Sequence, residues 1–382
     1  MIQQITSTGG MGTIHIVLTK WCNQGCKGCN QSIEDRNNTN SNLKLTSFIK
    51  KEIIMLFKFY ELNNKSINIS FFGGEPLTQH KTIIEIIEWL GTEKLNPAQI
   101  SIPTSGGKNQ SLIKYVPNII EAIQRSFVWD EKPKFILSQS YDGPNNEELR
   151  NSSKEEIQKS IWYIDEFKYN NNFSENHFKP KYTSCLIPQV ITEDYFIDTY
   201  KDVLEVTGRI PNFRIPYLIH EDSNLDTIVF KNAIEKFLNY LIENSGNFVI
   251  KNSKDYAKMY MVNKVIKDEY LDNPIIPKLF SDTIRLLCKD LPTEFNWCQA
   301  GVSHYAIDAN GLVENGCEYL DKPASELHDK MMEHCNKCEI KDHCMKPCLK
   351  NMEESDLTIK SFFRQCTIRK ILLNQIIKTL KG

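Results

Sequence analysis

Short strand-like runs alternate with longer helical patterns between residues 14 and 245, and this alternation constrains the fold more than any other feature. The runs are rich in β-branched and aromatic residues, which favour strands. They are residues 14–19, 67–72, 99–103, 135–140, 182–187 and 213–218. Parallel strands need crossover helices, so the alternation predicts a parallel sheet. Because six strand–helix units are fewer than a closed (β/α)8 barrel contains, we expect an α/β fold with an open, partial (β/α)6 barrel.

Two of the helical patterns are regular enough to predict a buried face. The first places six large side chains on one stripe: Phe48, Ile49, Ile53, Leu56, Phe57 and Tyr60. The second has apolar residues at helical spacing, namely Ile157, Ile161, Ile164 and Phe167. It opens with Ser153 followed by Glu156, which is the signature of a capping box. Two amphipathic helices are therefore expected against the sheet.

Twelve cysteines lie in two groups with an almost empty middle. A small secreted chain would use them for disulfides, but this chain is long and has no signal-peptide pattern. We therefore expect a cytoplasmic protein, in which clustered cysteines are metal ligands or catalytic groups. The formal charge of −2 gives no basic excess for nucleic acid, and no apolar run is long enough to span a membrane.

The first group, Cys22, Cys26 and Cys29, forms a CxxxCxxC run directly after the first predicted strand. Three thiolates can hold a cubane iron–sulfur cluster by three irons and leave the fourth iron open. An open coordination position is typical of a catalytic metal site. The alternative is a zinc site that a distant fourth ligand completes.

Three further elements follow the second, third and fourth predicted strands, at the ends where α/β folds gather their sites. They are Phe72-Gly73-Gly74-Glu75-Pro76, Thr104-Ser105-Gly106 and Ser140-Tyr141-Asp142-Gly143. Together with the CxxxCxxC run they resemble the radical S-adenosylmethionine (radical SAM) superfamily, which carries a GGEP element, a Thr-Asn-Gly element and a ribose-contacting Ser-x-Asp-Gly at these places. Relatives have an aromatic residue before the third cysteine, where this chain departs with Gly28.

The resemblance implies the cofactors and the reaction. Cys22, Cys26 and Cys29 would hold the catalytic 4Fe–4S cluster, whose open iron chelates S-adenosylmethionine (SAM). The contacts to SAM would come from Gly73, Gly74, Glu75, Pro76, Thr104, Ser105, Ser140 and Asp142. Reductive cleavage of SAM, with an electron from a flavodoxin- or ferredoxin-type reductant, would give a 5′-deoxyadenosyl radical that abstracts a substrate hydrogen.

The second group of cysteines crowds the last quarter of the chain: Cys298, Cys317, Cys335, Cys338, Cys344, Cys348 and Cys366. Their spacing resembles the SPASM extension of radical SAM enzymes, which carries two auxiliary iron–sulfur clusters. The resemblance assigns Cys298, Cys317 and Cys348 to the inner cluster, and Cys335, Cys338, Cys344 and Cys366 to the outer one. The inner cluster is then one ligand short, so either His304 completes it or its iron is open to substrate. A four-thiolate structural zinc site is the alternative.

Glu318 directly follows Cys317, where anaerobic sulfatase-maturing enzymes have an Asp that acts as a base. A carboxylate beside a cluster could take a proton while the cluster accepts an electron, and the alternative is a solvated surface side chain. Cys185 and Cys288 stand apart from both groups, and each is expected to be a buried small residue. Roughly the last 90 residues show little regular periodicity, as in a small fold organised by metal.

The resemblance predicts a radical SAM partial barrel over residues 1–245, a helical linker over 246–290 and a SPASM domain over 291–382. It implies an enzyme that modifies a residue of a ribosomally made precursor peptide by cross-linking, thioether formation or oxidation. Two rival functions stay open, namely oxidation of a protein Ser or Cys, as in sulfatase maturation, and a zinc-binding interaction module. Because little chain precedes Cys22, leader-peptide binding is expected to use the barrel, the linker or a separate protein.

Overall fold

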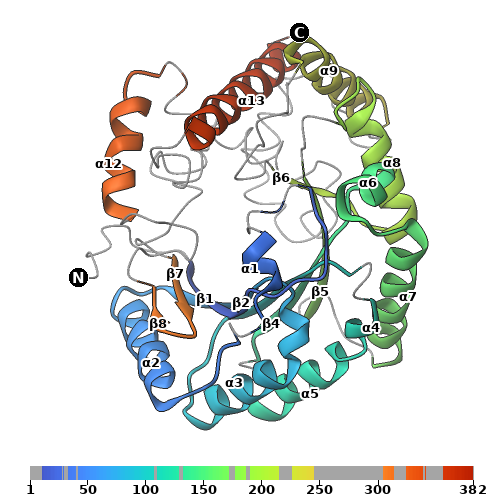
Figure 1. Ribbon diagram of the computed structural model, residues 1–382. Coiled ribbons are helices and arrows are strands. Elements are labelled where there is room, and N and C mark those ends of the chain that lie inside the picture. Colours follow the sequence, from blue (N-terminus) through green and yellow to red (C-terminus); the bar gives the residue numbers. More distant parts are fainter. Residues whose placement is uncertain are drawn as a thin grey trace. The chain divides into compact units, whose positions relative to one another are not determined.

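The computed structural model describes residues 11–27, 29, 33–39, 42–106, 110–128, 132–171, 177–185, 190–214, 226–244, 304–313, 324–338, 340 and 356–381. The chain divides into two compact units (Figure 1). The first comprises Met1–Tyr141, Asn146–Lys181 and Gln299–Leu327, and the second comprises Asp142–Asn145, Tyr182–Cys298 and His328–Gly382. The predicted linker over 246–290 lies outside the described residues, so the predicted domain boundaries stay a prediction.

The first unit is built around strands that are hydrogen-bonded in the order β4-β3-β2-β1-β7-β8. These strands are β1 (Met11–Thr19), β2 (Ser66–Gly73), β3 (Gln99–Thr104), β4 (Lys134–Ser140), β7 (His304–Asp308) and β8 (Gly311–Leu312). Neighbouring strands from β4 to β7 are parallel, and the β7–β8 pair is antiparallel. The predicted α/β class with a parallel sheet is confirmed, as are the first four predicted strands.

Strand β7 was missed by the sequence analysis. It pairs in parallel with β1, so that Thr13 lies opposite His304 and His15 lies opposite Ala306. The strand is only 5 residues long, and a run that short has too little periodicity to stand out from a loop. Its pairing gives β1 a hydrogen-bonded neighbour on each side, because β2 pairs with the other edge.

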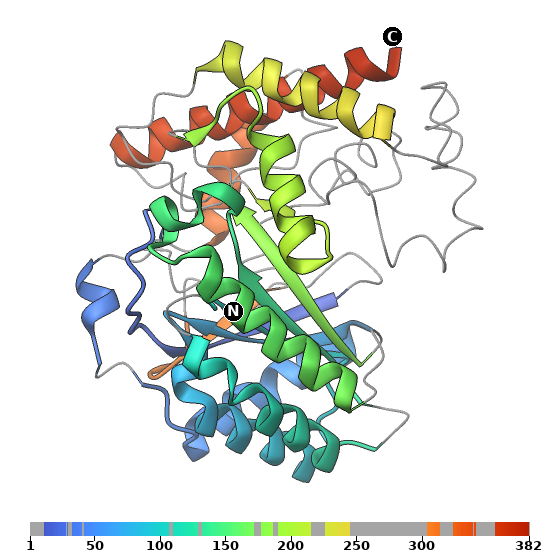
Figure 2. The ribbon, with the colours of Figure 1, turned by 90° about the vertical axis from the view of Figure 1, so that its right-hand side faces the viewer.

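Helices of the first unit connect the successive parallel strands, as crossover connections require. They are α1 (Ile33–Asn37), α2 (Ser47–Leu62), the 3-10 helix η1 (Pro76–Gln79), α3 (His80–Thr92), α4 (Gln110–Ile113), α5 (Val116–Ser126), α6 (Asn146–Arg150) and α7 (Lys154–Asn170). Helices α3 and α5 lie side by side in both ribbon views (Figures 1 and 2).

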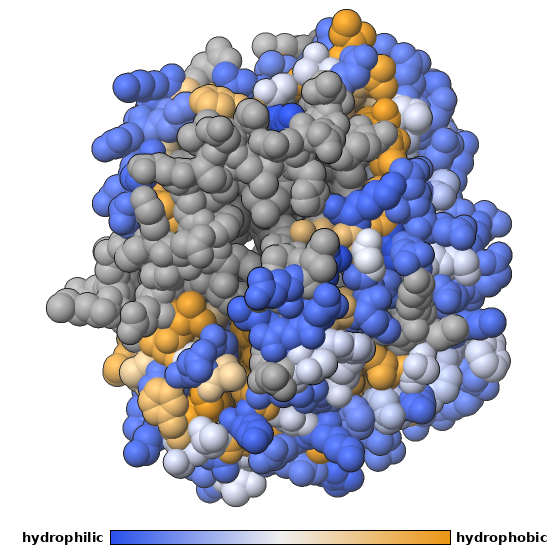
Figure 3. All heavy atoms as spheres, viewed as in Figure 1, coloured by the Kyte–Doolittle hydropathy of each residue, from blue (hydrophilic) through white to orange (hydrophobic). Residues whose placement is uncertain are grey.

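Helix α2 begins after Thr46, whose side chain caps it by accepting a hydrogen bond from the Ile49 N–H. Five residues of the predicted stripe are buried, but Phe48 is 52% exposed, so its predicted place in the core is wrong. The Phe48 ring lies against Gly311 of β8, where a Cβ would overlap the ring. Figure 3 shows hydrophobic side chains at the surface over this part of the first unit. Phe48 therefore covers the β7–β8 hairpin instead of entering the core.

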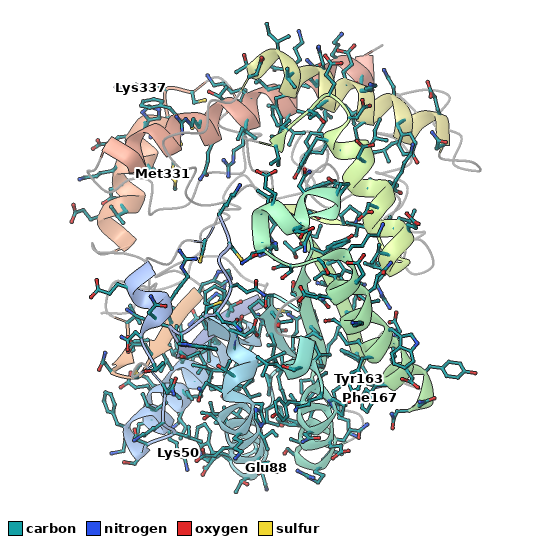
Figure 4. All side chains as sticks on the ribbon, turned by 45° about the vertical axis from the view of Figure 1, so that its right-hand side comes forward. Lys50, Glu88, Tyr163, Phe167, Met331 and Lys337 are labelled. Atoms are coloured by element: carbon teal, nitrogen blue, oxygen red, sulfur yellow. The ribbon has the colours of Figure 1, made fainter. Side chains whose placement is uncertain are left out.

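Helix α7 opens with the predicted capping box. The Glu156 N–H donates to the Ser153 hydroxyl at 3.3 Å, and the Ser153 N–H donates to the Glu156 carboxylate at 3.0 Å. The three isoleucines of the predicted stripe are buried, and Phe167 packs partly buried against the core. Tyr163 and Phe167 follow each other by one turn of this helix (Figure 4). The predicted amphipathic helix is confirmed.

In the strands of the first unit, every second side chain points toward the helices. Ile14 and Ile16 of β1 and Ile69 of β2 belong to one hydrophobic cluster with residues of α2, α3 and α5. Successive side chains of a strand point to opposite faces, so Thr13 and His15 lie on the face away from these helices. The sheet therefore has one apolar face under the helices and a second face on which polar residues gather; we call the second one the inner face.

Strand β5 (Phe178–Cys185) begins in the first unit and ends in the second, where it pairs in parallel with β6 (Asn212–Arg214). It starts before the predicted strand over 182–187, because Lys179 and Lys181 alternate with buried residues and hide the strand from a search for apolar runs. Residues 186–187 and 215–218 of the two predicted strands lie outside the described residues.

The second unit has a hydrophobic cluster of its own. Its helices are η3 (Gly143–Asn145), α8 (Tyr195–Thr207), α9 (Thr227–Asn244) and α13 (Asp356–Lys381), and α12 (Ala324–Cys335) ends in it. Ile368, Leu372 and Ile376 of α13 pack with α8 and α9 in this cluster. The expectation of little regular structure near the C-terminus is therefore wrong for the 26 residues of α13, whose apolar stripe is narrow and flanked by charged residues. No helix in the described part of the chain is long and apolar enough to cross a membrane.

Candidate functional site

The cysteine run lies directly after β1 and is held by backbone hydrogen bonds to two helices of the first unit. The Cys22 N–H donates to the Arg36 carbonyl of α1 at 2.9 Å, and the Lys27 N–H donates to the Leu149 carbonyl of α6 at 2.9 Å. In addition, the Cys29 N–H donates to the Cys26 carbonyl at 3.4 Å. The run is therefore fixed at Cys22 and Lys27, and a local hydrogen bond joins its second and third cysteines.

A polar side chain inside the cysteine run fixes its middle. Gln24 is 3% exposed, and its side-chain amide lies 3.4 Å from the Ser152 hydroxyl, which follows α6. The Gln24 carbonyl accepts a hydrogen bond from the Arg36 guanidinium at 3.4 Å. Buried polar groups need such partners. The residue between two of the cysteines is thus a structural anchor that the sequence analysis did not single out.

The three thiols of the run lie close together. Burial, together with the negative charges that the neighbouring Glu75, Cys26 and Cys29 can carry, raises the pKa of Cys22 to about 12, and a hydrogen bond with the Gln24 backbone opposes the rise. Cys22, Cys26 and Cys29 are all free thiols. Thiolates crowded in this way need a positive partner, and a bound metal centre supplies one. The residues present fit an iron–sulfur cluster at this place.

No three His, Cys, Asp or Glu side chains among the described residues are close enough to share one metal ion. A cubane cluster binds each thiolate through a different iron, so it needs its ligands around a wider body than a single ion does.

The Gly73–Gly74–Glu75 turn packs against the entry to the cysteine run. The Gly74 N–H donates to the Thr19 carbonyl at 2.7 Å, and the Glu75 N–H donates to the Trp21 carbonyl at 3.0 Å. Gly73 has a φ of +130°, and a Cβ at either glycine would overlap the backbone of residues 19–21. The two glycines are thus required by the approach of one backbone to another.

Glu75 joins the second and third sequence elements. Its carboxylate is buried and accepts hydrogen bonds from the Thr104 hydroxyl at 2.9 Å and from the Leu77 N–H at 3.3 Å. It also accepts from the N–H and the hydroxyl of Ser105, at 3.0 and 2.8 Å. Burial raises the pKa of Glu75, and these hydrogen bonds oppose the rise. The structure therefore brings the GGEP and Thr-Ser-Gly elements together through one side chain.

Gln139, a residue that the sequence analysis did not single out, closes the other side of the Thr-Ser-Gly element. It lies opposite Thr104 in the sheet, and its side chain packs against Gly106, where a Cβ would overlap it. Gly106 has a φ of +68°, which favours glycine. The buried Gln139 amide has no hydrogen-bond partner among the described residues. No local pattern marks such a residue in a sequence.

Ser140 is the last residue of β4, and the element that it opens continues into the second unit. There the fully buried Asp142 carboxylate accepts a hydrogen bond from the Cys185 N–H at 2.6 Å. Cys185 ends β5 and is partly exposed, so the expectation of a buried residue within an apolar strand is wrong. Its carbonyl accepts from the Tyr195 hydroxyl at 2.8 Å, which fixes the end of the strand.

Comparison with known proteins shows what this arrangement is related to. A family model described as a 4Fe-4S single cluster domain matches residues 8–126, which contain the cysteine run and the Gly73–Gly74–Glu75 turn. Over 403 aligned positions the chain is 25% identical to the radical SAM cyclopropyl synthase TigE of Paramaledivibacter caminithermalis, covering 100% of this chain and 77% of that protein. The chain is a radical SAM enzyme.

Two solved structures share the fold of this radical SAM enzyme. Native anSMEcpe with bound AdoMet superposes with a TM-score of 0.62 at 13% identity, over 97% of this chain and 100% of that one. Streptococcus suis SuiB bound to its precursor peptide SuiA superposes with a TM-score of 0.51 at 14% identity, over 94% of this chain and 75% of that one. At such identities the likeness concerns the fold.

Three of the cysteines assigned to the SPASM region lie within the described residues. Cys335 ends α12 and is buried, and its carbonyl accepts a hydrogen bond from the Cys338 N–H at 2.9 Å. The ring of His334 meets the edge of Phe362 at 4.7 Å between centroids, one turn before Cys366 in α13. The end of α12 therefore lies beside the part of α13 that carries Cys366.

The remaining residues assigned to the auxiliary clusters lie outside the described residues, as do Glu318, Cys288 and Gly28. Those cluster residues are Cys298, Cys317, Cys344 and Cys348. His304, the possible fourth ligand of the inner cluster, is described and opens β7 next to His15. Whether His304 or an open iron completes the inner cluster stays a prediction.

Proposed function

We propose that the chain binds a 4Fe–4S cluster through Cys22, Cys26 and Cys29, binds SAM beside it, and modifies a residue of a ribosomally made precursor peptide. The observation that carries the proposal is the gathering of the three thiols beside Glu75, whose turn packs against the backbone directly before Cys22. When bound, the cluster and SAM supply one-electron chemistry and a radical able to abstract hydrogen.

The residues of the chain position this chemistry. The Gly73–Gly74–Glu75 turn holds its backbone groups at the C-terminal end of β2, beside the end of β1. Glu75 uses both carboxylate oxygens to fix Thr104 and Ser105, so these hydroxyls keep one arrangement before any ligand binds. Preorganised polar groups lose less entropy when they bind a ligand. The contacts of Pro76, Ser140 and Asp142 to SAM belong to the same proposal.

The substrate class in this proposal rests on the relatives. TigE is a radical SAM cyclopropyl synthase, and SuiB was solved with a precursor peptide. A peptide substrate also agrees with the cysteines of the C-terminal region, which support the proposal of two auxiliary clusters there. The proposal covers cross-linking, thioether formation and oxidation of the peptide, and its reductant is a flavodoxin- or ferredoxin-type protein.

The test uses the full chain with its clusters reconstituted anaerobically. It is incubated with SAM, dithionite and the short peptide encoded nearest to its gene, and the products are 5′-deoxyadenosine and a peptide of altered mass. A mass change that requires SAM and reductant supports the proposal. A protein that carries zinc without iron or sulfide, or that forms no 5′-deoxyadenosine, would contradict it and leave the zinc-binding module as the explanation.

A further inference from the structure

Two histidines lie next to each other on the inner face of the sheet in the first unit. His15 is in the middle of β1, and His304 opens the neighbouring strand β7. Their rings meet edge-to-face with 5.7 Å between centroids, and the edge of Phe72 from β2 meets His15 at 5.6 Å. Ile14 and Tyr305, the adjacent residues, belong to the core under the helices, so both imidazoles point to the inner face.

The His15 imidazole differs from the neighbouring Asn68 side chain on the inner face, which has hydrogen-bond partners. The Asn68 side chain donates to the Thr13 hydroxyl at 3.4 Å and accepts from the Gln99 amide at 3.0 Å. Among the described residues, the Nδ1 atom of His15 is buried without a hydrogen-bond partner. Both histidines are only partly exposed.

An imidazole without a hydrogen-bond partner, enclosed among protein groups, costs free energy unless something bonds to it. A purely structural position would be filled at lower cost by an apolar residue such as the neighbouring Val17, which is buried on the same face. The unpartnered His15 nitrogen beside a second imidazole therefore indicates a place where a ligand completes the hydrogen bonds. Phe72 and the paired Asn68–Gln99 side chains would form fixed walls around it.

Imidazole nitrogens both donate and accept hydrogen bonds, so an amide or a hydroxyl of a ligand could pair with them.

We propose that His15, with His304 beside it, forms a hydrogen-bonding subsite for a polar group of the substrate peptide, an amide or a hydroxyl, that pairs with the Nδ1 atom of His15. This inference rests on the proposed function, because it assigns part of the site to the same peptide. It deepens that function by naming residues that would bind the peptide.

The first experiment measures peptide kinetics with the reconstituted full chain and the gene-neighbour peptide. Losing one neutral hydrogen bond in His15→Phe or His304→Phe should raise the KM for peptide about 3- to 10-fold, with a smaller effect on kcat. His15→Gln keeps a hydrogen-bonding end and should restore most of the affinity. His177→Phe, the same change at a partly exposed histidine outside the pair, is the control and should leave KM unchanged.

The outcomes separate this inference from the proposed function. If the wild-type chain modifies the peptide but His15→Phe and His304→Phe keep its KM, or His15→Gln is no better than His15→Phe, the subsite is wrong and the enzyme assignment stands. If the wild-type chain does not modify the peptide, the proposed function fails and the subsite falls with it.

A second experiment needs no variant and so does not depend on how a variant folds. Diethyl pyrocarbonate acylates neutral imidazole nitrogens, and mass spectrometry locates the modified histidines. We expect His15 or His304 to react in the reconstituted chain and to be protected by the peptide, while His177 reacts equally in both samples. Equal reaction with and without peptide, or no reaction at the pair, would overturn the subsite.

Discussion

The Oε2 atom of Glu75 accepts two hydrogen bonds from Ser105, one from its N–H at 3.0 Å and one from its hydroxyl at 2.8 Å. The two residues follow different strands, β2 and β3, and the contact locks the ends of those strands to each other. The Gly73–Gly74–Glu75 turn and the Thr-Ser-Gly element thus act as one unit, and disturbing either should disturb both.

Replacing Glu75 by Gln should test this lock. The amide keeps the shape of the side chain, but its NH2 group would face the hydrogen-bond donors of Ser105 or Thr104. Each buried polar group left without a hydrogen-bond partner costs about 1–3 kcal/mol of stability. We expect a lower free energy of unfolding by that amount and weaker SAM binding, measured by urea unfolding and equilibrium dialysis. The matched control is Glu88→Gln, at an exposed residue labelled in Figure 4 that pairs with Arg125 at 2.8 Å. Exposed pairs contribute about 0–1 kcal/mol, so equal losses in both variants would contradict the lock.

Replacing Cys22, Cys26 or Cys29 by Ala should abolish SAM cleavage and leave the auxiliary iron in place. The reason is that each thiolate binds one iron of the cluster, and two ligands do not hold it. Formation of 5′-deoxyadenosine and iron content are the measurements. Cys185→Ala is the control, because the hydrogen bonds of Cys185 with Asp142 and Tyr195 use its backbone, and it should keep full activity. A triple variant that still forms 5′-deoxyadenosine would refute the cluster assignment.

Reconstitution should load about 12 irons per chain if all three clusters are cubanes, and fewer if one auxiliary cluster is smaller. Iron and acid-labile sulfide analysis gives the number, and about four irons per chain would exclude the two auxiliary clusters. Because metal ligation stabilises a cluster-bearing fold, Cys335→Ala should also lower the soluble yield, and Cys185→Ala should not.

Glu318→Gln should separate radical formation from product formation. The amide keeps the shape of the side chain but cannot act as a base, and losing a general base costs on the order of 10²–10⁴ in rate. We expect SAM cleavage and hydrogen abstraction to persist while product forms more slowly, so the ratio of product to 5′-deoxyadenosine falls at saturating peptide. An unchanged ratio and rate would make Glu318 an ordinary surface residue and weaken the sulfatase-maturase-like rival.

The histidine pair predicts how stability depends on pH. A histidine in the unfolded chain has a pKa near 6.5, and burial lowers the pKa of His15 to about 4. Between these values the unfolded chain binds more protons, so the free energy of unfolding falls as the pH is lowered from 6.5 to 4. His15 contributes a slope of up to about 1.4 kcal/mol per pH unit in this window and none above it. Burial, with smaller effects of the nearby His15 and Lys65, also lowers the pKa of the neighbouring His304 to about 3, so His304 contributes to the pH dependence in the same direction.

The measurement is urea unfolding of the reconstituted chain at several pH values between 7 and 5. Other groups titrate too, so the informative quantity is the difference in slope between the wild-type chain and His15→Phe. We expect the variant to lose stability less steeply on acidification than the wild-type chain. Parallel curves would show that His15 is as easily protonated in the folded chain as in the unfolded one.

Much of the first unit could be predicted from the sequence because its strands and helices carry recognisable local sequence patterns. The sequences of β1 to β4 are rich in β-branched residues. Ser153 and Glu156, within four positions of each other, indicate where α7 begins. The position of Phe48 was predicted wrongly because helical spacing alone does not show where a stripe ends. What decides its exposure is Gly311, a residue far along the chain.

The candidate site was predictable to the same extent. The order of the sequence elements on the strands predicts that their ends meet, and the contact of Glu75 with Thr104 and Ser105 agrees with this. Gln139 and His15 carry no local signal, because an isolated polar residue in a strand looks the same whether it faces a partner or a ligand. Such residues become visible only when the pairing of strands is known.

The pairing of β7 with β1 has a consequence for how the chain is made. The strand that leads into the cysteine run gains one of its two neighbours from His304–Asp308, about 285 residues after Thr19. At typical rates of synthesis, that edge of β1 stays unpaired for on the order of 15–60 s, until β7 has been made. An unpaired edge is a template for association with other chains, so a ribosome that stalls between the two strands leaves an aggregation-prone product. The demand for a chaperone at this edge of β1 should therefore fall once β7 emerges.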